Sequence, residues 1–317
     1  MLNRSLNARA YRLTEPLEAR AEELRIAVRD IHDGGRIYDF GVEATGGLEA
    51  GLELARICMA GLARVNLESG LWFGSRRPVV TVATDDPVRA CLFSQYAGWQ
   101  LAVGKFFAMG SGPMRAAAHR EELFQKLKYS ETAELTVGVL EGRKLPDEHV
   151  FAAISEKTGV LRDHIRLLIA PTASLAGTLQ VVARSVETAL HKMLEVGFDV
   201  GQVVSGFGSA PLPPIGANDL QSIGWTNDAI LYGGSVTLWV NGEIDQIRQL
   251  GPQIPACASD AYGRPFLEIF EAAGRDFYKI DPHLFSPGEL ILNHLPSGEI
   301  FTFGKTNADV LKKSFAG

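Results

Sequence analysis

The chain has 317 residues, of which 46% are hydrophobic and 21% charged, and its formal net charge is −6. This composition is typical of a globular protein and excludes a disordered chain. The acidic balance argues against nucleic acid or an anionic membrane as the main partner, and no run approaches the ~20 apolar residues of a membrane span. The N-terminus is charged throughout and lacks the apolar core of a signal peptide, so we expect a cytoplasmic protein.

In chain order, the N-terminal half alternates amphipathic segments with short apolar runs. The pattern predicts helices over residues 5–25, 46–61, 87–97 and 145–159, and strands over residues 79–82, 99–103, 133–141 and 164–170. Residues 25–43 are predicted to form a hairpin, because Asp33-Gly34-Gly35 supplies the positive φ values of a tight turn. Pro87 suits the first turn of its helix, and Gly159 suits the position just after a helix.

The C-terminal half continues with a long predicted helix that opens at Ser174 and ends at Gly197. The later elements are a strand running into a proline-rich loop over 202–214, paired strands over 229–243, a helix over 264–274, a hairpin over 288–304 and a helix over 307–315. Helices and strands mix without a strict alternation, so the predicted fold class is α+β (mixed α/β). The length predicts two domains, which we place at residues 1–165 and 166–317, and either one could be discontinuous.

Metal and disulfide chemistry find no support in the local sequence. Cys58, Cys91 and Cys257 are far apart, and an odd, sparse set of cysteines in a large chain indicates reduced thiols. No CxxC or HExxH motif occurs, and the histidines are scattered. We therefore expect no metal site.

The stretch QVVARSVETALHKMLE, residues 180–195, has the pattern of an amphipathic helix with two distinct faces. The apolar face is formed by Val182, Val186, Ala189, Leu190 and Met193. The opposite face carries Arg184, Glu187 and His191. On an exposed face, Arg184 and Glu187 would form a surface ion pair of small energetic value. If a second domain covers that face, the same two side chains could form part of a site.

Two further polar stretches have both a binding and a structural interpretation. Gly110-Ser111-Gly112 precedes Pro113 and a predicted helix, and a glycine-rich turn at a helix start is a candidate anion site. It lacks the lysine of a phosphate-binding loop and the third glycine of a dinucleotide fingerprint, so a plain turn is the alternative. Asn227 and Asp228 are read as tips of a loop that could bind a heterocycle's polar edge, and a solvent-exposed turn is the alternative.

Several blocks taken together resemble methenyltetrahydromethanopterin cyclohydrolase. They are GVEATGGLEAGLELARICMAGLA, QYAGWQLAVGKFFAMGSGPMRA, APTASLAGTLQVVARSVETALHKMLE, TNDAILYGGSV and FYKIDPHLFSPGELILN. The likeness runs in order from about Gly41 to Phe315, which is nearly the whole chain. No single block would suffice, but the combination is specific.

The resemblance implies a cytoplasmic enzyme of one-carbon metabolism, a homotrimer whose two domains enclose the substrate in the cleft between them. It implies that the 5,10-methenyl carbon carried by tetrahydromethanopterin takes up water and opens reversibly to the N5-formyl form. In the family an arginine and a glutamate three residues apart act on the water, and these positions match Arg184 and Glu187. A segment that lines the reacting carbon matches Gln95, Tyr96 and Ala97. Because some archaeal relatives carry a basic residue in place of Tyr96, the resemblance implies the bacterial branch associated with methylotrophy and formaldehyde oxidation.

The chemistry explains why such a pair would suffice. A methenyl bridge between two nitrogens is an amidinium cation and already electrophilic, so the enzyme has to position one water and remove its proton. Glu187 is the predicted general base, and Arg184 is predicted to donate to the water or to the developing formyl oxygen. We expect no tightly bound cofactor, with tetrahydromethanopterin as the carbon-carrying substrate. Gly110–Gly112 and Asn227–Asp228 are predicted contacts to the pterin or its tail.

Two alternative functions belong to other classes of protein. One is a phosphate- or nucleotide-binding α/β protein without cyclohydrolase activity, which would use Gly110–Gly112 to hold an anion. The other is a structural or regulatory oligomer that has kept the fold and lost the chemistry. The presence of both Arg184 and Glu187 speaks against the second, because a relic could have lost either one.

Overall fold

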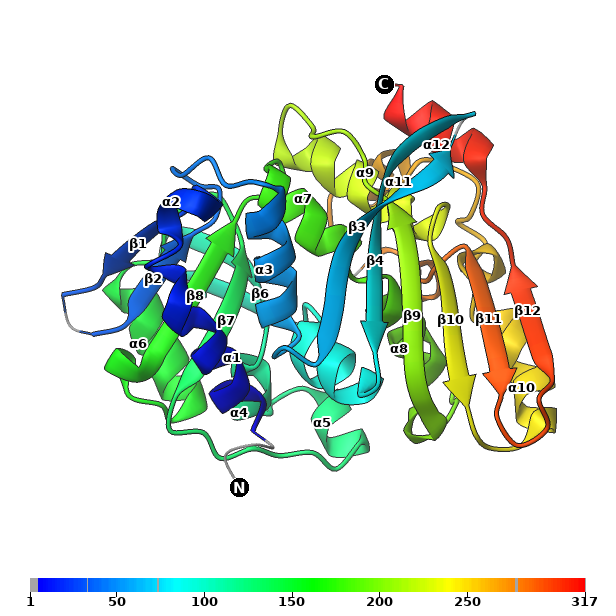
Figure 1. Cartoon of the computed structure of the whole chain (residues 1–317), viewed down its shortest axis with the longest axis horizontal. Coiled ribbons are helices and arrows are strands. Elements are labelled where there is room, and N and C mark those ends of the chain that lie inside the picture. Colours follow the sequence, from blue (N-terminus) through cyan, green and yellow to red (C-terminus); the bar gives the residue numbers. More distant parts are fainter. Residues whose placement is uncertain (1–4, 33, 73, 277–278, 317) are drawn as a thin grey trace. The chain divides into compact units, whose positions relative to one another are not determined.

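The computed structural model describes residues 5–32, 34–72, 74–276 and 279–316. The chain is 41% helical and 25% strand, and its strands form two mixed sheets (Figure 1). The predicted α+β class is therefore confirmed. None of the helices in the described ranges is both long and apolar enough to cross a membrane.

The chain divides into two compact units, each of which is discontinuous in sequence. The first unit runs to Leu62 and resumes over Arg89–Gln180, and the second comprises Ala63–Val88 and the residues from Val181 onward. The contiguous ranges 1–165 and 166–317 do not coincide with these units. The reason is strand pairing, because the hairpin that follows Leu62 hydrogen-bonds to a strand near residue 205.

The first unit contains a six-stranded sheet in the order β1-β2-β8-β7-β6-β5. Its strands are β1 (Ala27–Asp30), β2 (Arg36–Asp39), β5 (Trp99–Val103), β6 (Phe106–Ser111), β7 (Thr136–Glu141) and β8 (Ile165–Ala170). The pairs β2/β8 and β8/β7 are parallel, and the outer pairs are antiparallel. The predicted hairpin is confirmed, with Gly34 and Gly35 at positive φ, whereas Asp33 lies outside the described residues.

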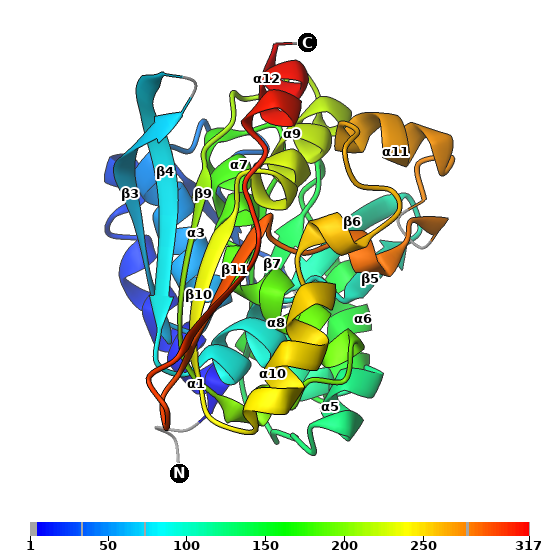
Figure 2. The ribbon, with the colours of Figure 1, turned by 90° about the vertical axis from the view of Figure 1, so that its right-hand side faces the viewer.

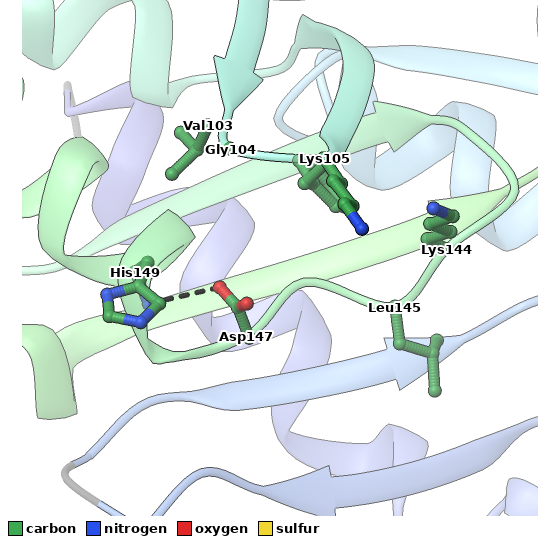
Figure 3. A pocket seen from close by; sticks show the side chains of 8 residues that line it. Val103, Gly104, Lys105, Lys144, Leu145, Asp147 and His149 are labelled. Carbon is green, nitrogen blue, oxygen red and sulfur yellow. Dashed lines mark hydrogen bonds between the residues drawn. The ribbon is translucent and has the colours of Figure 1, made fainter.

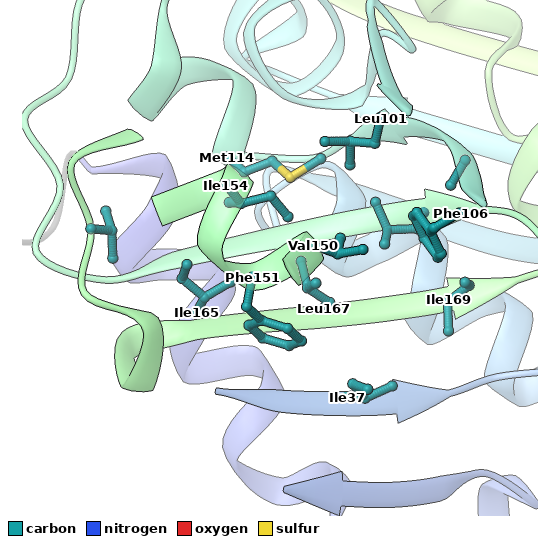
Figure 4. Packing of buried hydrophobic residues seen from close by; sticks show 13 residues of the cluster. Ile37, Leu101, Phe106, Met114, Val150, Phe151, Ile154, Ile165, Leu167 and Ile169 are labelled. Atoms are coloured by element: carbon teal, nitrogen blue, oxygen red, sulfur yellow. The ribbon is translucent and has the colours of Figure 1, made fainter. Parts of the chain in front are cut away.

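The helices of the first unit are α1 (Leu6–Thr14), η2 (Glu15–Leu17), α2 (Ala21–Leu24), α3 (Leu48–Cys58), the π-helix η3 (Val88–Gln95), α4 (Met114–Ala118), α5 (Glu122–Lys126), α6 (Glu148–Thr158), η4 (Arg162–His164) and most of α7 (Leu175–Val182). Among these helices, α1, α3, α4 and α6 pack against this sheet. Figure 4 shows Val150 and Phe151 of α6 lying with Leu167 of β8 in one apolar cluster. Burial of these side chains holds α6 on the sheet.

The second unit contains the sheet β12-β11-β10-β9-β4-β3. Its strands are β3 (Ala63–Trp72), β4 (Ser75–Thr84), β9 (Val203–Pro211), β10 (Ser235–Val240), β11 (Glu289–His294) and β12 (Ile300–Gly304). Its helices are α8 (Ser185–Glu195), η5 (Val200–Gln202), α9 (Asp219–Leu231), α10 (Ile244–Leu250), η6 (Gly251–Gln253), η7 (Ala256–Ala258), α11 (Phe266–Ala272), η9 (Pro282–Leu284) and α12 (Ala308–Phe315). Only β10/β11 is parallel, and α8 and α10 lie on the same side of the sheet (Figure 2).

Several predicted elements differ from the structure. The helix predicted over 5–25 is two short helices joined by η2, and the helix predicted over 87–97 is a π-helix that ends at Gln95. The paired strands predicted over 229–243 are the end of α9, a turn and the single strand β10. The helix predicted from Ser174 to Gly197 is interrupted, and this interruption bears directly on the candidate site.

Candidate active site

Arg184 stands at the break between two helices. α7 ends at Val182, and the Arg184 backbone (φ −88°, ψ 9°) forms the N-cap of α8. Its N–H donates to the Val181 carbonyl at 3.1 Å, and its own carbonyl accepts from Thr188 N–H at 2.9 Å. The continuous helix assumed from the sequence is therefore wrong at this point. Arg184 caps the first turn of α8, and Glu187 lies within that turn.

Both predicted catalytic side chains are buried. Arg184 is 7% exposed and Glu187 is 4% exposed, which rules out a solvated surface pair. Buried charges persist only where other groups compensate them. Glu187 lies in the first turn of the 11-residue helix α8, where the backbone N–H groups of the helix start attract a negative charge. On the side predicted to be polar, Arg184 and Glu187 are thus buried, whereas His191, farther along the helix, is 22% exposed.

Two glycines of β9 allow the start of α8 to approach the sheet. A Cβ added at Gly208 would collide with Ser185 Oγ and would lie 2.8 Å from Val186 Cγ2, and one at Gly206 would lie 3.0 Å from Val186 Cγ1. A Cβ is essentially never found closer than 3.0 Å to another heavy atom, so a side chain at position 208 would force the helix or its side chains to move, and one at position 206 would be at this limit. The segment QVVSGFGSA therefore sets the position of the turn that carries Arg184 and Glu187.

Ser185, between the two predicted catalytic residues in sequence, was not singled out by the sequence. It is 0% exposed, and its Oγ has no hydrogen-bond partner among the residues that the structure describes. A buried hydroxyl without a partner is destabilising, and such groups commonly bind a water or a ligand. Only the neighbourhood of Arg184 and Glu187 would have pointed to it, since a lone serine in a helix carries no signal.

Gln95 and Tyr96 lie at the C-terminal end of the π-helix η3. The Tyr96 N–H donates to the Cys91 carbonyl at 2.9 Å, which is the i to i+5 bond of a π-turn. Gln95 is 0% exposed, while Tyr96 and Ala97 are partly exposed. π-turns are rare and are frequently found at functional sites. The segment that the resemblance assigns to the reacting carbon thus has an unusual backbone.

The structure places Gly110–Gly112 next to this segment. Gly110 and Ser111 end strand β6, and the Gly112 N–H donates to the Ser94 carbonyl at 2.8 Å. Ser111 Oγ donates to the Val139 carbonyl at 3.2 Å. Because the Gly112 amide is engaged and the stretch is buried, the geometry gives no support to an open anion cradle. Its contacts instead support the end of η3.

Asn227 and Asp228 lie in helix α9 and not in the predicted loop. Asp228 is 0% exposed, and its carboxylate accepts from Phe266 N–H at 2.8 Å and from Ser314 Oγ at 2.5 Å. Burial raises the pKa of Asp228 to about 7, against the lowering effect of these two hydrogen bonds. Asn227 Nδ2 donates to the Ile223 carbonyl at 2.8 Å. Asp228 therefore links α9 to α11 and α12, and its predicted contact with a pterin stays a prediction.

A cavity of about 370 Å³ lies elsewhere in the first unit. Figure 3 shows four of the residues that line it, which are Lys105 from the turn between β5 and β6, Lys144, and Asp147 and His149 from the start of α6. The His149 N–H donates to Asp147 Oδ1 at 3.1 Å, which is an ordinary helix cap. None of the predicted site residues lines this cavity. It offers no acid–base pair comparable to Arg184 and Glu187.

Within the described ranges, no group of three or more His, Cys, Asp or Glu side chains is arranged to hold a metal ion. Cys58 and Cys91 are buried, Cys257 is exposed, and none of the three takes part in a disulfide.

A buried carboxylate and a buried guanidinium in one helical turn are groups with which an enzyme can move protons. Comparison with known proteins identifies the family. The cyclohydrolase (MCH) family model matches residues 5–315, and the chain belongs to this family and is an enzyme.

Three relatives show how far the similarity extends. A methenyltetrahydromethanopterin cyclohydrolase of Methylobacillus flagellatus is 45% identical over 98% of this chain and 95% of its own length. A protein of the same name from Rhodopirellula baltica is 46% identical over 89% of this chain and 86% of its own. One from Methanosarcina mazei is 39% identical over 98% of each. The resemblance seen in the sequence is confirmed, and the nucleotide-binding alternative is not supported.

Proposed function

We propose that this enzyme is a methenyltetrahydromethanopterin cyclohydrolase, which hydrates the 5,10-methenyl bridge and opens it to the N5-formyl form. The similarity to relatives of that name over nearly the full chain carries this proposal. The burial of Arg184 and Glu187 in one turn supports it, because the reaction needs a sheltered base and a hydrogen-bond donor.

The proposed reaction uses one water and no covalent intermediate with the protein. The water oxygen bonds to the methenyl carbon while the Glu187 carboxylate accepts one of its protons. The tetrahedral adduct then breaks its bond to N10. Its hydroxyl loses the second proton of the water, N10 takes up one proton, and the carbon remains on N5 as the formyl group. The net change releases one proton, since the substrate is a cation and the product amide is neutral.

Arg184 has a complementary role in this scheme. Its guanidinium donates to the incoming water or to the oxygen that becomes the formyl oxygen, where negative charge develops. The guanidinium stays protonated, so it acts through hydrogen bonds and charge and not as an acid. Because the substrate carries positive charge, the Glu187 carboxylate also favours its binding.

We further propose that Gln95, Tyr96 and Ala97 line the reacting carbon, and that no cofactor is tightly bound besides the carrier itself. Gly110–Gly112 and Asn227–Asp228 are proposed pterin contacts, and Gly112 also supports the Gln95 segment through its hydrogen bond to the Ser94 carbonyl.

We also propose that the enzyme is a cytoplasmic homotrimer that works in formaldehyde oxidation in methylotrophic metabolism. Sedimentation equilibrium tests the trimer, and a monomer would reject that part alone.

The activity is tested by following the ultraviolet band of the methenyl carrier as purified protein is added. The proposal expects the band to decay much faster than the spontaneous rate, in proportion to protein concentration. The methenyl derivative of tetrahydrofolate, run in parallel, shows whether the pterin itself is recognised. Decay at the spontaneous rate with both carriers would reject the proposed function.

A further inference from the structure

Arg115 lies at the centre of the contacts around the end of η3. Its side chain is 0% exposed in α4 of the first unit. Nη1 donates to the Leu92 carbonyl at 3.1 Å and to the Ser94 carbonyl at 3.3 Å. The last carbonyls of a helix lack partners within it, so Arg115 supplies donors that the end of η3 needs.

Glu121 holds the guanidinium in place. Arg115 Nε donates to Glu121 Oε1 at 2.9 Å, and Nη2 donates to Oε2. This is the two-pronged pairing that a planar guanidinium makes with a carboxylate and that lysine cannot reproduce. The pair satisfies the buried charge and leaves Nη1 directed at the two carbonyls. Glu121 thereby fixes the direction in which Arg115 donates.

The same guanidinium lies near the ring of Tyr96. Its central carbon is 4.9 Å from the Tyr96 ring centroid and 5.4 Å from that of Phe124, within the range of cation–π attraction. A Cβ added at Gly98 would lie 2.7 Å from Tyr96 Cε1 and would also collide with Glu121 Oε2. Glycine at this position therefore allows Tyr96 and Glu121 to pack together.

Arg115 consequently contacts both neighbours of Gln95, through the carbonyl of Ser94 and the ring of Tyr96. The Ser94 carbonyl accepts a second hydrogen bond from Gly112 N–H at 2.8 Å, and Ser94 Oγ donates to the Cys58 carbonyl at 2.6 Å. The backbone on either side of Gln95 is thus fixed from several directions. The backbone of Gln95 is therefore held in place, and this restricts where its side chain can lie.

We propose that Arg115, oriented by Glu121, is a positioning residue for the cyclohydrolase reaction, because it sets the placement of Gln95 and Tyr96. The inference rests on the proposed function, in which this segment lines the reacting carbon. Arg115 acts through the segment and has no assigned contact with the substrate. A displacement of about 1 Å in such a segment is enough to lower turnover by up to 10²-fold.

The test compares Arg115→Lys with a matched variant, Arg166→Lys. Arg166 Nη1 also bridges two oxygens, the Tyr11 carbonyl at 3.1 Å and Thr14 Oγ1 at 2.5 Å. Its guanidinium also lies over a tyrosine ring, 3.6 Å from the Tyr11 centroid. Both arginines belong to the first unit, but Arg166 has none of these contacts with the Gln95 segment. The two substitutions therefore remove similar oxygen and aromatic-ring contacts from different places, and Arg115→Lys in addition removes the two-pronged pair with Glu121.

Steady-state kinetics and thermal unfolding are measured on the full chain for both variants. We expect Arg115→Lys to lower kcat about tenfold or more, with KM within about threefold, and Arg166→Lys to keep kcat within about twofold at a similar loss of Tm. Glu121→Gln keeps the shape of the side chain that pairs with Arg115 and removes its negative charge. We expect this substitution to lower kcat about threefold or more. It provides the test if Arg115→Lys does not fold.

The outcomes separate this inference from the proposed function. Wild-type protein that leaves the methenyl band unchanged would reject the proposed function itself. If the wild type is active, equal kcat values for Arg115→Lys and Arg166→Lys would overturn the positioning role. If Arg115→Lys does not fold, an unchanged kcat in Glu121→Gln would overturn it. A kcat loss confined to the Arg115 and Glu121 variants, with the KM of each kept near that of wild type, would support it.

Discussion

Arg184 and Glu187 occupy the N-cap and the first turn of the same helix, and both side chains are buried. In a continuous helix, an arginine and a glutamate three residues apart would share one face as a weak ion pair. The break at Arg184 changes this relationship, because the Arg184 backbone is not helical while Glu187 lies in the first turn of α8. The turn therefore holds a buried guanidinium and a buried carboxylate, the two groups that the proposed activation of water requires.

Arg184→Lys tests whether the planar shape of the Arg184 guanidinium is needed in addition to its positive charge. An ammonium group keeps the charge but cannot reproduce the planar fork, so we expect kcat to fall about 10²-fold. Arg248→Lys, at a largely exposed position of the second unit, serves as the control and should stay near wild-type activity. A mild effect of Arg184→Lys would mean that only the positive charge matters.

Gly208→Ala tests whether the close packing of α8 on β9 positions the catalytic turn. The added methyl would meet Ser185 Oγ and lie 2.8 Å from Val186 Cγ2, and the β-branched valine has little freedom to move away. We expect a loss of about 1–3 kcal/mol in the free energy of unfolding from overpacking, with a lower kcat. Urea unfolding and steady-state kinetics measure both. An active, fully stable variant would show that the turn tolerates displacement.

Asp228→Ala tests the structural role of Asp228 against its predicted contact with the pterin. Removal of the carboxylate leaves Phe266 N–H and Ser314 Oγ without their acceptor. We expect the free energy of unfolding to fall by about 2–4 kcal/mol, whereas KM for the carrier changes little. Asp228→Asn, which keeps an acceptor oxygen, should be milder. A raised KM with unchanged stability would instead favour a substrate contact.

Lys192→Met tests a titration that the structure predicts in α8. Lys192 is 1% exposed, and its Nζ donates to the His283 carbonyl at 2.7 Å and lies 2.8 Å from His283 Nδ1. Burial lowers the pKa of Lys192 to about 8, although Asp281 and Glu195 oppose this shift. Between this value and the ordinary 10.5, the unfolded chain holds a proton that the folded chain lacks, so stability rises with pH.

The measurement is the free energy of unfolding of wild type and Lys192→Met at several pH values. Below pH 8 both states hold the proton, and the difference between the two proteins should be constant. Between pH 8 and 10.5 the wild type should gain stability relative to the variant, on the order of 1–3 kcal/mol. A difference that stays flat across this range would contradict the lowered pKa.

The sequence predicted the elements whose signals are local. The hairpin around Gly34 and the helix closed by Gly159 were predicted because a positive φ favours glycine wherever the chain turns sharply. Strand β3 was missed, although the alternation in ARVN, where Ala63 and Val65 are buried and Arg64 and Asn66 are exposed, gave a usable signal. Asn227 and Asp228 were taken for a loop because they are polar, yet Asn218 caps the helix that contains them.

The candidate site was only partly predictable. The resemblance supplied Arg184, Glu187 and the Gln95 segment, but the pattern could not show the break at Arg184, where neither proline nor glycine occurs. Nor could the pattern show the π-helix. It also could not show the hydrogen bonds from Arg115 to the Leu92 and Ser94 carbonyls, since these join residues more than 20 positions apart. Tertiary packing determines these features, and the local propensities of the residues do not reveal it.

The measurement that tests the proposed mechanism most directly is the turnover of Glu187→Gln beside Glu195→Gln. Glu195 ends the same helix with its side chain 39% exposed, so its substitution controls for a change of charge on α8. We expect Glu187→Gln to lower kcat by about 10²–10⁴-fold with a much smaller change in KM, and Glu195→Gln to remain close to wild type. Near wild-type turnover by Glu187→Gln would remove this carboxylate from the reaction and contradict the mechanism.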